Sequence, residues 1–184
     1  MKPHNGMRPH DIVVLLKILS MDENWMSKDL AASLYISESE ISESLNRSKY
    51  ARLLSVDKRS VHKNAFFDFL VSGLKYVFPT HASGRSVGVT TGHSAPILKD
   101  HFIFEESDQY VWPSEYGKTS GYAIQPLYPN QPLAAINDQL LYDKLALVDA
   151  FRVGRTRERN KAAEILKEIF NQDHAFEHSQ NQGR

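Results

Sequence analysis

Two helix starts lie close together in residues 27–63, and this spacing constrains the fold more than any other feature of the chain. Ser27 is a suitable helix N-cap, and Ser37 followed three residues later by Glu40 is a capping-box pattern. Only residues 34–36 remain to turn the chain between the two helices. The spacing therefore predicts a helix-turn-helix, in which the second helix is free to lie in a DNA groove.

The second helix, predicted over residues 37–52, divides into two faces at about 100° per residue. Ile41, Leu45 and Ser48 form the face that we expect to be buried. The opposite face is short and polar at first and bulkier toward its end, which is typical of a helix that reads base edges and then contacts phosphates. An ordinary solvated face explains the same pattern. The predicted DNA-contacting residues of this helix are Ser39, Ser42, Glu43, Asn46, Arg47, Lys49 and Tyr50.

A basic hairpin is predicted directly after this helix. Two short runs with alternating apolar residues, 53–56 and 60–62, flank Asp57-Lys58-Arg59. The predicted hairpin, over residues 54–63, would form a wing, with Trp25 or Met26 pairing with it as a minimal strand. Its cations Lys58, Arg59 and Lys63 are predicted to contact the DNA backbone or the adjacent minor groove.

Residues 9–78 resemble the winged helix-turn-helix transcription factors of bacteria, broadly the MarR-like regulators. The resemblance rests on LAASLYISESEISESLNRSKYARLL and on the basic hairpin that follows it. Ser48 departs from the family pattern, which usually has an apolar residue there, and Arg52 stands where a helix-ending Gly is common. The resemblance implies DNA binding as a homodimer, and it does not extend over residues 79–184.

The rest of the chain predicts a mainly helical α+β protein. After the hairpin, Asn64 can cap a helix that ends before Phe78-Pro79. Three short β-prone runs, at 84–91, 109–112 and 121–124, indicate an irregular subdomain in the middle of the chain. Two amphipathic helices follow, with a break at Asn137-Asp138 and an end at Val153-Gly154, and their apolar stripes favour a two-fold dimer. The predicted regions are a winged helix-turn-helix DNA-binding domain at 9–78, a β-containing subdomain at 79–133, dimerisation helices at 134–170 and a disordered tail at 171–184.

Charge and composition limit the classes of function. The formal net charge is 0, with 22 basic and 22 acidic residues, which is unusual for a nucleic-acid-binding protein. Glu43 would repel phosphates unless it accepts a hydrogen bond from a cytosine amino group. The chain has no cysteine, which excludes disulfides and thiolate metal sites. The first residues contain no apolar signal segment, so a cytoplasmic location is expected.

No enzyme is predicted, and therefore no catalytic residue. His93-Ser94 lies outside any G-x-S-x-G elbow, and the glycine-rich run at 88–96 lacks the lysine of a phosphate-binding loop. His81, His93 and His101 follow no metal-ligand spacing, so we predict no metal and no cofactor. The basic segment 151–161 has two interpretations: a solvated helix start that pairs with acidic residues of the middle region, which we favour, or a further set of phosphate contacts.

The sequence predicts a homodimeric, sequence-specific transcriptional regulator that binds double-stranded DNA. One alternative is a protein-interaction module, such as the antitoxin-like partner of an operon-encoded protein, which the zero net charge and Glu43 favour. In a third hypothesis the middle region senses a small-molecule effector, with Tyr110, Trp112 and Tyr122 as its aromatic lining.

Overall fold

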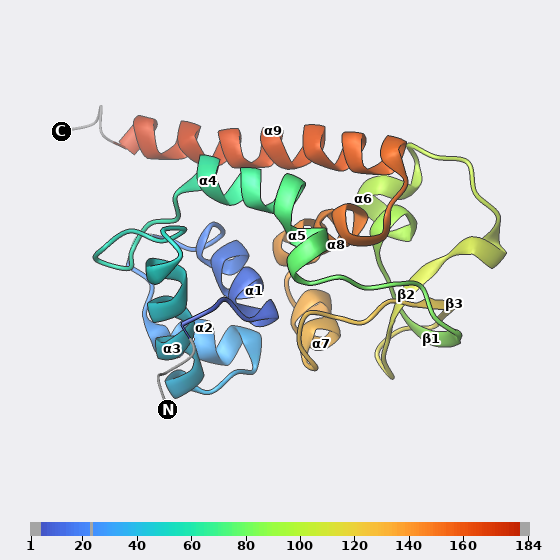
Figure 1. The fold of residues 1–184 in the computed structure, drawn as a ribbon, viewed down its shortest axis with the longest axis horizontal. Coiled ribbons are helices and arrows are strands. Elements are labelled where there is room, and N and C mark those ends of the chain that lie inside the picture. Colours follow the sequence, from blue (N-terminus) through green and yellow to red (C-terminus); the bar gives the residue numbers. More distant parts are fainter. Residues whose placement is uncertain (1–4, 23, 181–184) are drawn as a thin grey trace.

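Helix α8 (Gln139–Val153) lies at the centre of the molecule, as the computed structural model shows (Figure 1). The structure describes residues 5–22 and 24–180, with side chains as far as Asn171. Every residue of α8 from Lys144 to Phe151 is buried. A helix that is buried on all sides needs neighbours on all sides, and α1, α5, α6, α7 and α9 all pack against it.

The chain is mainly helical with one small sheet, so the predicted α+β class is confirmed. None of the helices in the described part of the chain is both long and apolar enough to cross a membrane. In addition to α8, the elements are α1 (Pro9–Ile18), α2 (Ser27–Leu34), α3 (Glu38–Tyr50), α4 (Lys63–Asp68), a π-helical turn (Phe69–Gly73), α5 (Leu74–Val77), β1 (Arg85–Thr90), a 3₁₀ turn (Gly92–Ser94), α6 (Pro96–Lys99), a second 3₁₀ turn (Glu106–Asp108), β2 (Tyr110–Pro113), β3 (Thr119–Ala123), α7 (Gln131–Ile136) and α9 (Thr156–Gln180).

Helix α1 connects the N-terminal helices to the rest of the core. Its residues Ile12 to Leu16 are fully buried, and the helix packs against α2, α3 and α8. Lys17 Nζ lies 2.6 Å from Asp138 Oδ2, and Asp138 also accepts a hydrogen bond from Leu141 N (3.0 Å) as the N-cap of α8. Burial would raise the pKa of the Asp138 carboxyl, but the hydrogen bonds from Lys17 and the Leu141 amide, together with the nearby lysine charges, outweigh it and lower that pKa.

Three predicted helix starts have different outcomes. Ser37 caps α3 as predicted, because its Oγ accepts from Glu40 N at 3.2 Å. The reciprocal half of the capping box is wrong, since the Glu40 carboxylate lies on Arg47 instead. The predicted cap Ser27 is instead the first residue of α2, where Asp29 accepts from the N-cap amide of Met26 at 3.0 Å. Similarly, α4 begins after His62 rather than at the predicted Asn64 cap.

The three predicted β-prone runs form one closed, three-stranded sheet. Strand β1 pairs antiparallel with both β2 and β3, and β2 pairs parallel with β3. The closure brings backbones unusually close, so that a Cβ at Gly88 would lie 1.9 Å from the carbonyl oxygen of Trp112. A Cβ at Gly117 would meet the Gly88 backbone at 1.8 Å. Both positions therefore require glycine for steric reasons.

One continuous hydrophobic core extends from Ile12 to Phe170 and crosses the predicted region boundaries at 78/79 and 133/134. Helix α9 buries Ala162, Leu166 and Phe170, and the ring of Phe170 stacks on Phe66 of α4 at 6.3 Å. The apolar stripes that predicted dimerisation helices are thus covered within the chain.

The backbone of α9 continues to Gln180, beyond the predicted end of the helix at Phe170. Residues 181–184 of the predicted tail lie outside the described residues, as do the side chains from residue 172 onward. Disorder of the tail at 171–184 stays a prediction.

Candidate nucleic-acid interface

Helix α3 lies at the edge of the molecule, at the end far from the strands (Figure 1). Its inner face is buried at Ile41, Ser44, Leu45 and Ser48, and it packs against α1 and α2. The outer face is polar and accessible, with Tyr50 at 70% exposure. All of the predicted contact residues on this helix except Arg47 are exposed, namely Ser39, Ser42, Glu43, Asn46, Lys49 and Tyr50.

The turn between α2 and α3 is anchored from a distant part of the chain. Tyr35 ends α2 in the left-handed conformation (φ 54°), which costs a non-glycine residue about 1–2 kcal/mol. Its carbonyl accepts from Asn130 Nδ2 at 2.9 Å, and its hydroxyl accepts from Asn137 Nδ2 at 3.1 Å. Tyr128 Oη donates to the carbonyl of Leu34 at 2.9 Å. Residues that flank α7 therefore hold the strained turn in place.

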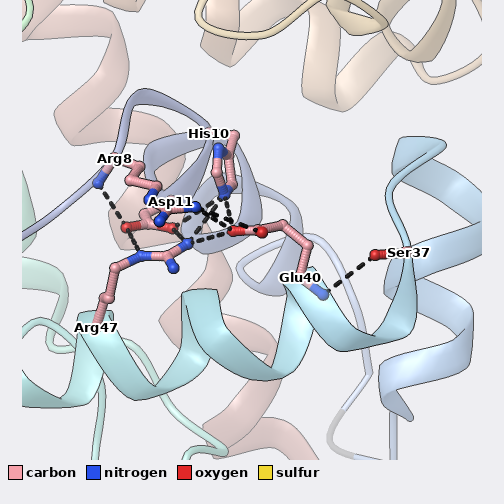
Figure 2. A network of polar contacts seen from close by, with 6 residues as sticks. All are labelled: Arg8, His10, Asp11, Ser37, Glu40 and Arg47. Atoms are coloured by element: carbon pink, nitrogen blue, oxygen red, sulfur yellow. Dashed lines mark hydrogen bonds and ion pairs between the residues drawn. The ribbon is translucent and has the colours of Figure 1, made fainter. Parts of the chain in front are cut away.

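A buried ion pair fixes α3 to α1 (Figure 2). Arg47 donates through Nε and Nη2 to the two carboxylate oxygens of Asp11, at 2.9 and 2.8 Å. Asp11 is fully buried and also accepts from the backbone amide of Arg8 at 2.7 Å. This fork geometry is rigid because the two parallel hydrogen bonds set both distance and orientation. The hydrogen bonds from Arg47 to Asp11 raise the pKa of the Arg47 guanidinium against the opposing effect of burial.

Glu40 and His10 extend this pair to the surface (Figure 2). Arg47 Nη2 also donates to Glu40 Oε1 at 2.8 Å. His10 Nε2 lies 2.8 Å from the same carboxylate oxygen and 3.0 Å from Arg47 Nη2, so it can donate to Glu40 or accept from Arg47, but not both. Burial would raise the pKa of Glu40, but hydrogen bonds from Arg47 and His10 outweigh it and lower that pKa.

The position of Arg47 corrects the predicted contact set. Helical spacing put Arg47 on the flank of the outer face, but only 6% of the residue is exposed and its guanidinium is held inside the molecule. A bound and buried guanidinium is unavailable to bases. Asp11 gave no signal of this pair in the sequence, because an acid in the first turn of a helix is equally explained by the helix dipole.

The predicted wing is a single tight turn rather than a two-stranded hairpin. One isolated bridge joins Leu54 to Val61, and Ser55 N donates to the carbonyl of Ser60 at 2.9 Å. Lys58 adopts the left-handed conformation (φ 62°) at the tip. The side chains of Ser55 and Asp57 accept hydrogen bonds from the backbone amides of Arg59 and Ser60, so these amides are bound within the turn rather than across a ladder.

The cations of this turn differ in their surroundings. Arg59 is exposed, but its Nη1 donates to the carbonyl of Trp25 at 2.6 Å and its guanidinium lies 5.2 Å from the centre of the Trp25 ring. This side-chain contact replaces the strand predicted at Trp25 or Met26. Lys58 is half-buried at the tip, and Lys63 is half-buried at the first position of α4. The turn therefore packs against Trp25, just before α2, with Lys58 at its tip.

The adjacent residues His93 and Ser94 of the middle region form hydrogen bonds with separate partners. Ser94 Oγ accepts from the amide of Tyr110 at 2.8 Å, and His93 Nε2 donates to the carbonyl of Asp108 at 3.0 Å, so the adjacent His and Ser face different partners. Among the described side chains, residues 5–22 and 24–171, no three of the metal-binding types come together.

Asp149 is a buried polar centre that the sequence did not reveal. Its Oδ2 accepts from Thr91 Oγ1 (2.8 Å) and from Trp112 Nε1 (2.6 Å), and its Oδ1 accepts from Arg152 Nη1 (2.8 Å). Trp112, expected to line an effector site, is fully buried and serves this network instead. Asp149 thus connects the ends of two strands to the central helix.

Comparison of the chain with models of known protein families, with curated proteins and with solved structures gives no match.

Proposed function

We propose that the chain is a sequence-specific DNA-binding transcriptional regulator that inserts α3 into the major groove. The observation that carries the proposal is the outer face of α3, which is exposed, polar and held rigidly from behind by the pair between Asp11 and Arg47. A reading helix must be both accessible and fixed in orientation, because base contacts depend on positions within fractions of an ångström. In this proposal α2 and α3 act as the helix-turn-helix and the basic turn at 54–63 as a short wing.

The proposed contacts differ in what they recognise. Asn46 lies at the middle of the exposed face, and an asparagine amide can pair bidentately with an adenine edge. Lys49 and Lys58 supply charge for phosphates, which positions the helix without selecting a sequence. Arg47 has no place in this contact set, because its side chain is already bound.

Fluorescence anisotropy on DNA from upstream of the gene tests the proposal, with scrambled DNA of equal length as the reference and two salt concentrations. We expect tighter binding to the native sequence and weaker binding at higher salt.

Asn46→Ala should weaken binding to the native site by about 1–3 kcal/mol and affect scrambled DNA little. Lys58→Ala should weaken both and lower the salt slope by about 1. Lys118→Ala, an exposed lysine at the opposite end of the molecule, is the matched control. Equal affinity for native and scrambled DNA in every variant would contradict direct reading.

Association as a homodimer is part of the proposal, since half-sites about one helical turn apart require two reading helices. The apolar stripes of α8 and α9 are occupied within the chain, so a dimer would use other surfaces. Large exposed apolar side chains occur at Tyr76, Val77, Ile136 and Leu140. Sedimentation velocity with and without DNA measures the stoichiometry.

A protein partner in place of DNA is the second candidate. Glu43 lies on the exposed face of α3, and Met26, Tyr35 and Tyr50 add exposed apolar area near it in sequence. Aromatic side chains and few cations are typical of a protein interface rather than of a phosphate-binding one. Co-purification of a native partner together with absence of DNA binding would favour this candidate.

A further inference from the structure

A pocket of about 640 Å³ lies where the first turn of α9 meets the β-containing region. This end of α9 is far from α3 (Figure 1). The volume falls within the range of small-molecule sites in proteins. Residues from several separate segments of the chain form the walls, and those that carry the argument are His93, Phe104, Tyr110, Tyr122, Arg155 and Glu158.

The side chain of His93 is the decisive feature of the pocket. The residue is only 7% exposed, and its ring is held edge-on by Phe104 (4.7 Å) and Tyr110 (4.5 Å). Nε2 lies 3.0 Å from the carbonyl of Asp108, which can only accept, so Nε2 carries the hydrogen. In the neutral ring Nδ1 is therefore an acceptor, and it is buried without a hydrogen-bond partner in the described structure. A buried acceptor of this kind costs free energy until a donor reaches it.

Glu158 provides a second acceptor beside this nitrogen. Its Oε2 lies 4.0 Å from His93 Nδ1, too far for a direct hydrogen bond. The same oxygen accepts from the backbone amide of Arg155 at 2.9 Å, which fixes the carboxylate at the start of α9. Two acceptors are thus held side by side in the pocket. Arg155 balances only one of the two lining carboxylates, Asp108 and Glu158, so with a neutral His93 the site carries one net negative charge.

We propose that this pocket binds a small planar ligand that presents paired N–H donors to His93 Nδ1 and Glu158, as an amidinium or an amino-substituted heterocycle does. The aromatic walls suit such a ligand, since flat rings stack on Tyr and Phe and cationic ones gain from their electron-rich faces. The inference does not depend on DNA binding by α3, because the pocket and α3 share no lining residue.

Isothermal titration calorimetry of the full chain tests this inference with two probes, benzamidine for the amidinium class and guanosine for the heterocycle class. Benzoate, which has the same ring but an anionic group, is the matched ligand control. We expect at least one probe to bind with a dissociation constant of about 1 mM or tighter, and benzoate to bind at least about tenfold more weakly.

Glu158→Gln is the decisive variant. Glutamine keeps an oxygen for the Arg155 amide, so the start of α9 is retained, but it loses the charge. The variant should weaken binding of the successful probe at least about tenfold. Glu164→Gln, an exposed glutamate further along α9, should bind like the parent. Failure of both probes, equal binding of benzoate, or equal binding by Glu158→Gln would overturn the inference.

Discussion

Two buried aspartate–arginine pairs stabilise the two halves of the molecule in different ways. The pair between Asp11 and Arg47 joins residues of α1 and α3 that are 36 positions apart. The pair between Asp149 and Arg152 lies within one turn of α8. Both aspartates are fully buried, so each requires its partners to avoid the cost of an isolated charge.

The two networks differ in where they lead. Asp11 is linked through Arg47 to Glu40 and His10, which are titratable groups near the surface. Asp149 instead accepts from the neutral groups of Thr91 and Trp112, deep in the core. The first pair thus fixes one surface helix and connects it to partly exposed groups. The second pair attaches the sheet to the central helix and is isolated from solvent.

Removal of the core network should have the largest effect. Asp149→Ala leaves the Arg152 guanidinium with an uncompensated charge and deprives Thr91 and Trp112 of their acceptor. We therefore expect the free energy of unfolding to fall by about 4–5 kcal/mol. Urea denaturation measures this free energy. If this variant does not fold, Asp149→Asn keeps an acceptor for Trp112 and should lose less stability. A loss below about 1 kcal/mol in both variants would show that the network is dispensable.

Removal of the pair between Asp11 and Arg47 should lower the free energy of unfolding by less, because Arg47 keeps Glu40 as a partner. Asp11→Ala should lower the free energy of unfolding by about 3 kcal/mol. If the pair also orients α3, DNA binding should weaken under conditions where the variant is still fully folded. Asp149→Asn, compared at the same folded fraction, is the control for general destabilisation. Unchanged affinity of folded Asp11→Ala would separate the ion pair from the proposed reading function.

A substitution on the inner face of α3 should change the free energy of unfolding by a smaller amount and should raise it. The hydroxyls of Ser44 and Ser48 are buried and make no hydrogen bond within the described structure. Ser48→Ala removes a buried polar group and favours the helix, so the free energy of unfolding should rise by about 0.5–1 kcal/mol. The exposed Ser42→Ala serves as the reference for helix propensity alone. A destabilised Ser48→Ala would indicate that the hydroxyl has an undetected partner, such as a bound water.

A substitution of Glu40, at the surface end of the Asp11 network, should change stability least, and the change should appear only at acidic pH. Because the pKa of Glu40 is lowered in the folded chain from its ordinary value of 4.5, the folded state binds its proton less readily than the unfolded state. Its contribution to stability is therefore present above about pH 4.5 and is lost as the pH falls through the lower, folded-state pKa. Glu40→Gln should flatten this part of the stability profile relative to the exposed control Glu38→Gln. Parallel acid profiles for the two variants would contradict the role assigned to Glu40.

Local sequence patterns predicted much of the fold, because they act over a few residues. The Ser37 cap, the end of α5 before Pro79 and the end of α8 at Val153 all follow from backbone chemistry within one helical turn. The three β-prone runs likewise formed strands close to their predicted bounds. The exposed outer face of α3 was predicted in the same way, from helical spacing alone.

The tertiary structure decided what each face contacts. Helical spacing could not show that Arg47 turns inward, because its partner Asp11 lies 36 positions away and only packing of α1 on α3 brings them together. The same holds for the apolar stripes of α8 and α9, which a sequence cannot assign to the core or to a second copy. The pairing of His93 with Glu158 across a pocket also depends on chain segments far apart in sequence. A sequence encodes caps, breaks and amphipathic faces locally, whereas burial of a charge or closure of a pocket is a property of the packed chain.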